Sequence, residues 1–249
     1  MARASNLRHT PSEYSSIPIL IAFPELVQNA HCLRATAGKE RMKRLIVAIT
    51  GASGVIYGIR ALEILRTIAD VETHLILSPS AARTIAEETD VAIEKVRALG
   101  DHLYNYKDVG AAVSSGSFRT EGMLIAPCSV KTLSGIANCF DDELVVRAAD
   151  VCLKERRRVV LVFRETPLHA GHIALMEQAT RNGAIVMPPV PAFYHRPKSV
   201  DDIVTQSVGR ALDLFGIDAK IVKRWKEDAG VNKRTVKHKR PTRTRSPNP

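Results

Sequence analysis

The sequence has no apolar segment long enough to span a lipid bilayer. It also has few cysteines: the four are Cys32, Cys128, Cys139 and Cys152, and no two of them form a CxxC pair. In a chain of 249 residues, this pattern indicates neither a structural zinc site nor a disulfide framework. We therefore expect a protein of the reducing cytoplasm that binds no metal and does not insert into a membrane.

The first 41 residues lack the charged, apolar and small-residue zones of a secretory signal, and they show no clear helical or strand period. Met42, Lys43 and Arg44 then lead directly into an apolar run. Residues 1–41 are therefore expected to be a flexible extension or an untranslated segment, with Met42 as the true initiator. Mass spectrometry of the native N-terminus would distinguish the two.

The formal net charge of +10 is typical of a nucleic-acid-binding protein, but the charge lies at the ends of the chain. Residues 233–245 contain seven Lys and Arg and no acid, and residues 1–44 add a net +4, which leaves about −1 for residues 45–232. We expect residues 230–249 to be a solvated, disordered basic tail. Salt-dependent contact with RNA or DNA is the alternative, as an added property and not the main one.

Apolar, strand-like runs alternate with amphipathic segments through most of the chain. This order predicts one three-layer α/β domain over residues 42–229, Rossmann-like (flavodoxin-like), with a mostly parallel sheet and helices on both faces. In such sheets, ligands bind beyond the carboxyl ends of the strands. The predicted strands are 45–49, 72–78, 122–126, 159–163 and 184–187. The first predicted helix follows the Gly-rich loop and ends near residue 69, and the others cover 81–88, 129–138, 143–155, 173–181 and 200–215.

The loop Gly51-Ala52-Ser53-Gly54 lies directly after the first predicted strand and opens a helix. Its small residues let backbone N–H groups approach an anion, the helix dipole favours negative charge, and Ser53 adds a hydroxyl donor. We therefore predict that the loop binds a phosphorylated ligand. The third glycine of the dinucleotide fingerprint is missing, because Ile56 and Tyr57 occupy that neighbourhood, so a plain strand-to-helix turn is the alternative.

Other polar groups follow later strands, and we predict that they converge with this loop on one edge of the sheet. Ser129 and Thr132 are placed to cap a helix or to hydrogen-bond a polar ligand. Each group alone could be a helix cap or a surface charge, and their coincidence favours a binding site. The groups are Ser78, Ser115-Gly116-Ser117, the segment from Pro127 to Thr132, and Arg164-Glu165-Thr166-Pro167.

Two basic residues, Arg147 and Lys154, are seven positions apart and share one face of a predicted helix. A solvated basic face is the alternative, and we expect the nearby charged residues 155–158 to be one. Arg147 is flanked by apolar residues, and such an arginine often has a specific anionic partner.

Together, these motifs resemble the UbiX-like flavin prenyltransferases, including members that accompany hydroxyarylic acid decarboxylases. The resemblance implies two substrates, reduced FMN and dimethylallyl phosphate, with the prenyl unit joined to N5 and C6 of the flavin without a metal. It implies a homo-oligomer, often a dodecamer, with sites built between subunits, and a UbiD-like decarboxylase that receives the product. The resemblance covers about residues 42–225 and rests on 51–54, 86–90, 115–117, 127–132, 147–156, 164–168 and 191–197.

The resemblance also implies roles for single residues. Those implied for FMN are Gly51, Ala52, Ser53, Ser78, Ser129, Val130, Lys131, Thr132 and Arg164. Those implied for dimethylallyl phosphate are Ser115, Lys154, Arg164, Tyr194, Arg210 and Trp225, and those implied for catalysis are Glu88, Glu165, Ser53, Lys154 and Arg147. The chemistry suits these residue types, because a leaving phosphate needs cationic donors and loss of the C6 proton needs a base.

The chain departs from the family pattern at Asn138-Cys139 and Glu143, where a Thr-Gly pair and an asparagine are usual, so local charge or subunit contact is expected to differ there. One alternative function is a flavin-dependent cysteine decarboxylase, which needs a catalytic histidine that the first helix lacks. His169 and His172 are interpreted as supporting or interface residues. The other alternative is a non-catalytic FMN-binding subunit of a decarboxylase, which the predicted catalytic residues disfavour.

Overall fold

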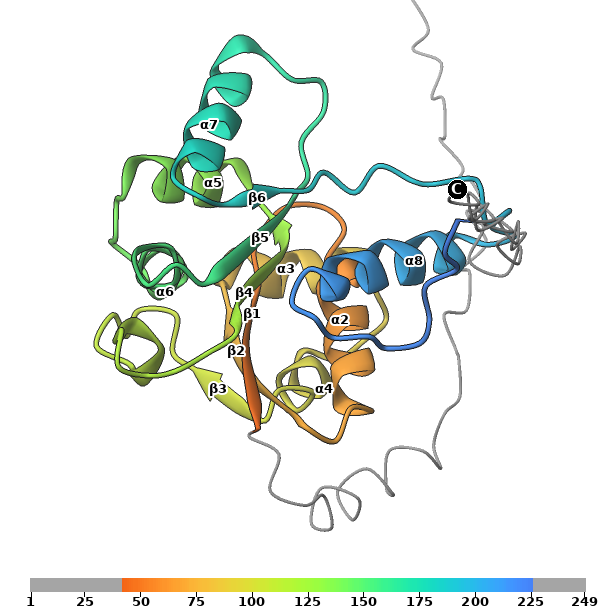
Figure 1. The fold of residues 1–249 in the computed structure, drawn as a ribbon, viewed down its shortest axis with the longest axis horizontal. Helices are drawn as coiled ribbons and strands as arrows, with labels where there is room; N and C mark the ends of the chain where they lie inside the picture. The colour runs from red at the N-terminus through yellow and green to blue at the C-terminus, as the bar shows by residue number, and fades with distance from the viewer. Residues whose placement is uncertain (1–41, 226–249) are drawn as a thin grey trace, which may run out of the picture.

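The computed structural model describes residues 42–225, so the predictions for residues 1–41 and for the basic tail lie outside the described residues. The described chain contains one six-stranded sheet in the order β3-β2-β1-β4-β5-β6, and every strand pair in it is parallel (Figure 1). The predicted α/β fold is confirmed. The strands are β1 (Lys43–Ile49), β2 (Val71–Leu77), β3 (His102–Tyr104), β4 (Gly122–Cys128), β5 (Arg158–Phe163) and β6 (Ile185–Val186).

Helices connect these strands and cover both faces of the sheet (Figure 1). The described helices are α2 (Ile56–Arg66), α3 (Pro79–Glu88), α4 (Ile93–Arg97), α5 (Val130–Asn138), α6 (Leu144–Lys154), α7 (Ala170–Arg181) and α8 (Val200–Asp213), with a 3-10 turn η1 (Ala112–Ser114). The sequence did not predict α4, β3 or η1. These elements have three to five residues each, which is too short to show a hydrophobic period.

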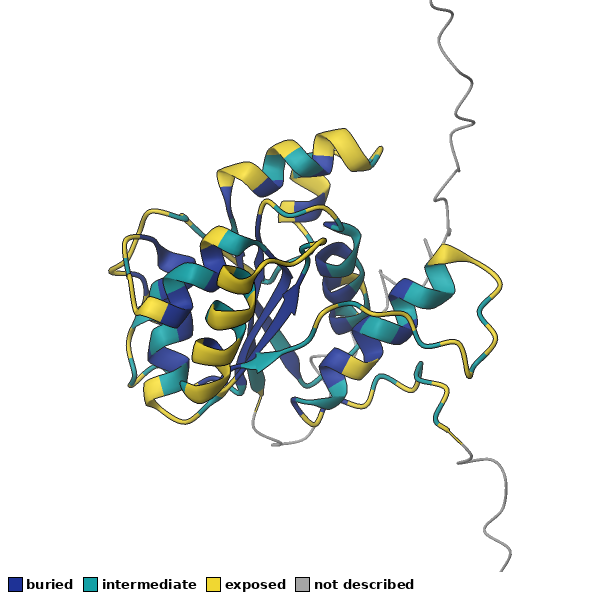
Figure 2. Cartoon of the chain, turned by 90° about the horizontal axis from the view of Figure 1, so that it is seen from above, coloured by how far each residue is buried: buried dark blue, intermediate teal, exposed yellow. Residues whose placement is uncertain are grey.

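The sheet separates two apolar cores, and its strands are buried between helices whose outer sides are exposed (Figure 2). The alternation along β1 shows the division: Leu45, Val47 and Ile49 pack into the core shared with α2 and α8, whereas Ile46 and Ala48 pack toward α5 and α6. Burial of β1 on both faces explains its continuous apolar sequence.

The order of the strands reverses between β1 and β4. The chain moves outward from β1 to β2 and β3, and then returns so that β4 pairs with the other side of β1. Ligands bind at such a switch point in open α/β sheets, beyond the carboxyl ends of the strands. The Gly51–Gly54 loop follows β1, and Ser129 follows β4, so both lie at this point.

Within residues 42–225, no helix is long and apolar enough to cross a bilayer.

Candidate active site

Thr50 links the carboxyl ends of β1 and β4. Its buried hydroxyl donates to the carbonyl of Pro127 at 2.7 Å and accepts from the backbone N–H of Ser129 at 2.9 Å. Ser129 in turn caps α5, with its Oγ 3.3 Å from the backbone nitrogen of Thr132. Thr50 therefore fixes the distance between the two loops at the switch point. Thr50 was not predicted as a site residue, although a polar residue directly after an apolar strand is a usable signal for a group at the carboxyl edge of a sheet.

Replacing Thr50 by Val should destabilise the protein by about 1–3 kcal/mol and weaken FMN binding, because the nearly isosteric change leaves the backbone N–H of Ser129 without its acceptor and removes one of the two donors to the Pro127 carbonyl. Urea unfolding and flavin fluorescence titration would measure the two effects. Thr50→Ser keeps the hydroxyl and is the matched control. Equal losses in the two variants would show that the methyl group matters and the hydrogen bonds do not.

The Gly51–Gly54 loop is shaped by two glycines. A Cβ on Gly51 would lie 2.3 Å from the Cβ of Ser80, so a larger residue cannot fit against the start of α3. Gly54 has a φ of +95°, a conformation that L side chains rarely adopt. Helix α2 begins at Ile56, two positions after the loop. The small residues of this loop are therefore required by its backbone path.

The loop already holds an anionic group. The carboxylate of Glu88 accepts hydrogen bonds from the backbone N–H groups of Gly54 at 2.8 Å and Val55 at 3.2 Å. Glu88 is the last residue of α3, and it reaches the N-terminal end of α2, where the helix dipole favours negative charge. The chemistry predicted for the loop is thus present, with a side chain of the protein as the anion.

Gly58 allows close packing between α2 and the sheet. A Cβ at this position would lie 2.2 Å from the carbonyl oxygen of Ala126 and 2.7 Å from the side chain of Ile49. Helix α2 therefore packs closely against β1 and β4. In dinucleotide-binding folds, the third glycine of the fingerprint serves the same purpose two positions earlier.

Replacing Gly58 by Ala should destabilise the protein by roughly 1–3 kcal/mol, because α2 has to move away from the sheet. Gly110→Ala is the matched control, since a Cβ there would meet only the Asp108 carboxylate, at 3.4 Å. Thermal unfolding would compare the two variants. Equal stability of Gly58→Ala and the wild-type protein would contradict the close packing.

Further predicted residues lie at the same edge of the sheet. Ser78 caps α3 through its Oγ and is almost fully buried. The backbone N–H of Arg164, which follows β5, donates to the carbonyl of Cys128 at 3.1 Å, so Arg164 and Glu165 lie beside the end of β4. Burial raises the pKa of the Cys128 thiol, which keeps the thiol protonated and unreactive.

Lys131 and Glu143 form an ion pair near the N-terminal ends of α5 and α6, with Nζ and Oε2 2.6 Å apart. The Glu143 side chain is only 6% exposed, and burial raises the pKa of its carboxyl group. Lys131 is predicted to bind FMN, and Glu143 is one of the departures from the family pattern. The structure joins the two, so the departure changes the local charge beside the predicted flavin site.

Arg147 has the anionic partners that its apolar neighbours predicted. Its Nη1 lies 3.1 Å from a carboxylate oxygen of Asp141 and 3.3 Å from one of Asp150. The pKa of Asp150 is raised by burial and then by the neighbouring Asp141. Arg147 therefore brings together a carboxylate of α6 and one of the segment before it, and its predicted part in catalysis stays a prediction.

The structure corrects the predicted position of Ser115. Its loop lies near Lys154, because a Cβ on Gly116 would be 2.8 Å from the Lys154 Nζ. Lys154 ends α6 and is followed by β5, which enters the sheet at its amino edge. Ser115 and Lys154 are therefore near the opposite edge of the sheet from the Gly51–Gly54 loop of the same chain.

The structure also corrects the prediction for Arg157, which was expected to be a solvated surface charge and instead forms structural hydrogen bonds. It is partly buried, and its guanidinium donates to the carbonyls of Gly116 at 2.6 Å and Phe118 at 2.7 Å. These two hydrogen bonds hold the loop that carries Ser115 beside the end of α6.

Tyr194 packs on α8 together with Trp225. The Tyr194 hydroxyl accepts from Nε2 of the buried Gln206 at 3.0 Å, and the rings of Tyr194 and Trp225 meet edge-on at 5.6 Å. Gln206 also binds the backbone of Lys223 through both ends of its amide. Sequence reasoning missed Gln206, because its partners are 12 and 17 positions away.

Arg210 lies near the C-terminal end of α8 and pairs with Asp213 at 2.6 Å. Just beyond it, the Phe215 ring lies 3.1 Å from the Cβ position of Gly122, at the amino end of β4. Arg210 is thus near the amino edge of its own sheet. Within residues 42–225, Arg210 therefore lies away from the Gly51–Gly54 loop, which is at the carboxyl edge of the sheet.

His169 and His172 stack with ring centroids 3.7 Å apart, and Nδ1 of His169 accepts from the backbone N–H of Gly171 at the start of α7. His169 is therefore a helix cap, which fits a supporting role.

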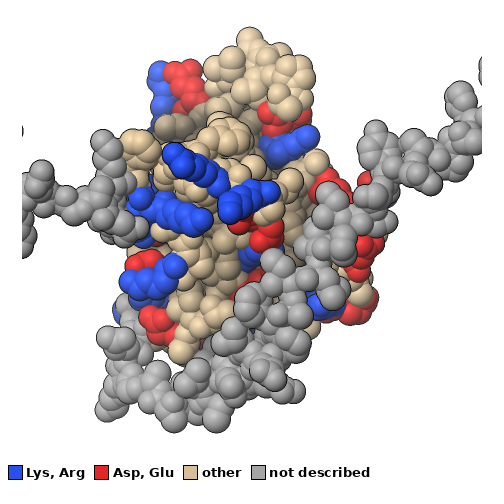
Figure 3. Space-filling model, turned by 90° about the vertical axis from the view of Figure 1, so that its right-hand side faces the viewer, with Lys and Arg blue, Asp and Glu red and all other residues tan. Residues whose placement is uncertain are grey.

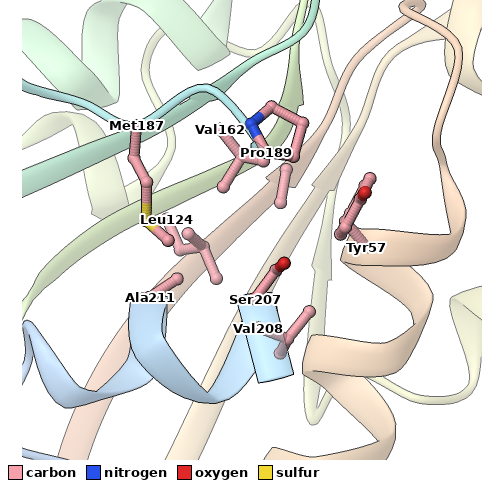
Figure 4. A pocket seen from close by; sticks show the side chains of 9 residues that line it. Tyr57, Leu124, Val162, Met187, Pro189, Ser207, Val208 and Ala211 are labelled. Carbon is pink, nitrogen blue, oxygen red and sulfur yellow. The ribbon is translucent and has the colours of Figure 1, made fainter. Parts of the chain in front are cut away.

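A small apolar cavity of about 10 Å³ lies between α2, β4, β5 and α8 (Figure 4). Tyr57, Val162 and Met187 are among the side chains that line it. A cavity of this size holds at most about one water molecule, so it is too small for a flavin or a prenyl group.

Comparison with known proteins identifies the family. Residues 33–211 match the family model described as Flavoprotein. The chain is 58% identical to the flavin prenyltransferase UbiX of Escherichia coli over 176 residues, which is 71% of this chain and 93% of the relative. The chain belongs to the UbiX-like flavin prenyltransferases. A mitochondrial flavin prenyltransferase of Saccharomyces cerevisiae is 50% identical over 192 residues, 77% of this chain and 79% of the relative.

Solved structures of UbiX-like proteins share the fold. The structure of AnUbiX in complex with FMN and dimethylallyl pyrophosphate has 52% identity and a TM-score of 0.73, and covers 74% of this chain and 98% of its own. A dodecameric FMN-dependent UbiX-like decarboxylase from Escherichia coli has 49% identity and a TM-score of 0.72, and covers 73% and 98%. The predicted family and fold are confirmed, whereas the roles of single site residues remain predictions.

Proposed function

We propose that this protein is a flavin prenyltransferase that joins the dimethylallyl unit of dimethylallyl phosphate to N5 and C6 of reduced FMN. The observation that carries the proposal is the arrangement at the β1–β4 switch point. There, the Gly51–Gly54 loop holds an anion, Thr50 ties it to Ser129, and Arg164 with Glu165 follows β5. A relative that is 52% identical was solved with FMN and dimethylallyl pyrophosphate, which agrees with two ligands at one site.

The residues at this edge fit a flavin phosphate. Glu88 occupies the backbone N–H groups of Gly54 and Val55, so the donors proposed for the phosphate are the hydroxyls of Ser53, Ser129 and Thr132, near the N-terminal ends of α2 and α5. FMN, when bound, supplies the two ring positions to which the prenyl unit is joined. The protein has to orient both substrates, stabilise the departing phosphate with cations, and accept the proton released from C6.

Glu165 is the proposed proton acceptor. Its Oε1 accepts from the backbone N–H of Thr166 at 3.0 Å, which leaves its other oxygen available. The neighbouring Arg164 can hydrogen-bond both a carboxylate and a phosphate, so the pair is suited to change partners as the phosphate leaves. Glu88 is the second acidic residue proposed to act in proton handling, and its hydrogen bonds from the N–H groups of Gly54 and Val55 fix its carboxylate at the loop.

We propose that the phosphate cradle is completed by neighbouring copies of the chain in a homo-oligomer. Tyr194 and Trp225 pack beside α8, and Arg210, near the C-terminal end of α8, lies toward the amino edge of the sheet, opposite the Gly51–Gly54 loop of the same chain. The segment before α8 extends from the body of the molecule (Figures 1 and 2) and exposes large apolar side chains, with Val190 76% and Phe193 66% exposed. Exposure of this extent is typical of an interaction surface.

Charge on the same side of the molecule agrees with an anionic ligand. Lys and Arg side chains gather near the middle of the face on which α8 lies (Figure 3). Arg210 and Arg224 share the carboxylate of Asp213, so two cations meet one anion at the end of α8. A relative that is 49% identical is dodecameric, which supports an oligomer here.

The recipient of prenylated FMN is proposed to be a UbiD-like aromatic acid decarboxylase in the cytoplasm. The test is to add the flavin product of this protein, made anaerobically, to a cofactor-free UbiD-like decarboxylase. Activation by the product and not by FMN supports the proposal. Equal activation by FMN alone would favour the alternative, in which the protein is a non-catalytic carrier of flavin.

A further inference from the structure

Two histidines and a glutamate meet on one face of β2 and β3. The Nε2 of His74 lies 2.9 Å from Oε1 of Glu72, and the Nε2 of His102 lies 3.4 Å from the same oxygen. All three ligand atoms lie within 4.8 Å of one another. Glu72 and His74 are two positions apart on β2 and so share a face, and His102 is the register partner of His74 on β3.

We propose that Glu72, His74 and His102 form a Zn²⁺ site that joins β2 to the edge strand β3. Two imidazole nitrogens and one carboxylate oxygen are a ligand set that zinc accepts, with a fourth position left for water. Ligands bound to a tetrahedral metal at about 2.0–2.2 Å lie roughly 3.3–3.6 Å apart. The Glu72–His102 separation of 3.4 Å lies in this range, the Glu72–His74 separation of 2.9 Å is shorter, and all three atoms lie within 4.8 Å of one another, so small side-chain movements would bring them to one ion. The expectation of no metal rested on cysteine spacing and on the family resemblance, and neither reports on His74 and His102, which are 28 positions apart and become neighbours only in the sheet.

The surroundings of His74 fit a metal ligand. Its Nδ1 lies 2.9 Å from the hydroxyl of Tyr104, so the Nε2 that faces Glu72 can be held in a fixed orientation. Metal-binding histidines usually have such a hydrogen bond on the other ring nitrogen. The ring is stacked on that of His102, with centroids 4.8 Å apart and an angle of 13° between the rings, so the exposed His102 side chain has to turn for both Nε2 atoms to converge on one ion.

Without a metal, hydrogen bonds of His74 hold the side chains of Glu72 and Tyr104 beside it. Neutral His74 can donate Nε2–H to Glu72 and accept at Nδ1 from the Tyr104 hydroxyl. Zn²⁺ would bind Nε2 of the tautomer that carries its proton on Nδ1, and His74 would then donate Nδ1–H to Tyr104. The ring stays neutral with one proton that has moved from Nε2 to Nδ1, so His74 releases no proton and no oxidation or reduction is involved.

A cation already competes for Glu72. The Nε of Arg44 lies 3.3 Å from Oε1 of Glu72, and its guanidinium lies over the ring of Phe118, 4.9 Å from the centroid. This positive charge lowers the affinity that the three ligands would otherwise give. Removing it should therefore tighten metal binding, whereas removing a ligand should weaken it.

The test uses the full chain, with Co²⁺ as a spectroscopic probe and Zn²⁺ as the competitor. We expect one Co²⁺ per chain to give the visible ligand-field absorption of a nitrogen and oxygen site, and Zn²⁺ to abolish that absorption. His102→Ala removes a side chain that is 53% exposed, so the fold should survive. It should weaken Zn²⁺ binding by at least about 100-fold, since loss of even an outer partner costs about 10–100-fold.

Three further variants define the site. Tyr104→Phe should weaken Zn²⁺ binding by about 10–100-fold, and Arg44→Gln should tighten it. His172→Ala, in the other histidine pair, is the matched control and should bind as the wild-type protein does. Absence of Co²⁺ absorption at millimolar metal, or unchanged affinity in His102→Ala, would overturn the proposal. Prenyl transfer by His102→Ala should stay unchanged, so the zinc site and the proposed function can fail independently.

Discussion

Glu165→Gln should retain FMN but slow prenyl transfer by about 10²- to 10⁴-fold, the usual contribution of a positioned acid or base. The amide keeps the shape of the side chain and can still accept from the N–H of Thr166, so the loop after β5 should keep its conformation. It cannot take up a proton as the carboxylate does. Single-turnover kinetics with saturating substrates would measure the rate, and flavin fluorescence would measure FMN affinity.

The matched control is Glu177→Gln, on the exposed surface of α7. Glu177 pairs only with Arg181, at 2.6 Å, among the contacts that the structure records for it, and its side chain is 61% exposed. Its replacement should change neither rate nor affinity. Normal turnover in Glu165→Gln would remove Glu165 from the mechanism and leave Glu88 or the released phosphate as the proton acceptor.

Mixing two inactive variants should restore activity if each site takes residues from two chains. Arg210→Ala should lower kcat/KM by about 10²-fold through loss of a donor to the departing phosphate, and Glu165→Gln disables the other side of the site. In a randomly assembled homo-oligomer of both variants, about a quarter of the sites pair an intact Glu165 with an intact Arg210. Activity should therefore rise to about a quarter of the wild-type value.

A second mixture is the control for this experiment. Arg164 and Glu165 follow the same strand of one chain, so a mixture of Arg164→Ala and Glu165→Gln leaves every site with one defect. That mixture should stay inactive. Failure of the first mixture, with co-assembly shown by native mass spectrometry, would mean that Arg210 and Glu165 do not meet between subunits.

The fold could be predicted from the sequence because its signals are local. The apolar run of β1 and the amphipathic helices that follow each strand fix the strand–helix alternation, and parallel pairing then follows. The Gly51–Gly54 loop was found for the same reason, since its small residues and the next helix are adjacent in the sequence. Gly58 was overlooked because only the close approach of the Ala126 carbonyl shows why a glycine is needed there.

The rest of the site depends on contacts that sequence spacing does not contain. Thr50 binds residues 77 and 79 positions away. Ser115 lies a few residues before β4, so it is near the amino edge of the sheet, where that strand begins, and the expectation that it joins the polar groups at the carboxyl edge overlooked this direction. Tyr194 and Arg210 could be named from a resemblance, but the packing of Tyr194 beside α8 and the place of Arg210 near the amino edge appear only in three dimensions.

The most direct test of the central claim is the mass of the flavin after anaerobic incubation of the protein with reduced FMN and dimethylallyl phosphate. Prenyl transfer predicts that bound FMN gains the mass of one dimethylallyl unit and that inorganic phosphate is released in equal amount. FMN that stays bound with its mass unchanged would contradict the proposed reaction and favour a flavin carrier.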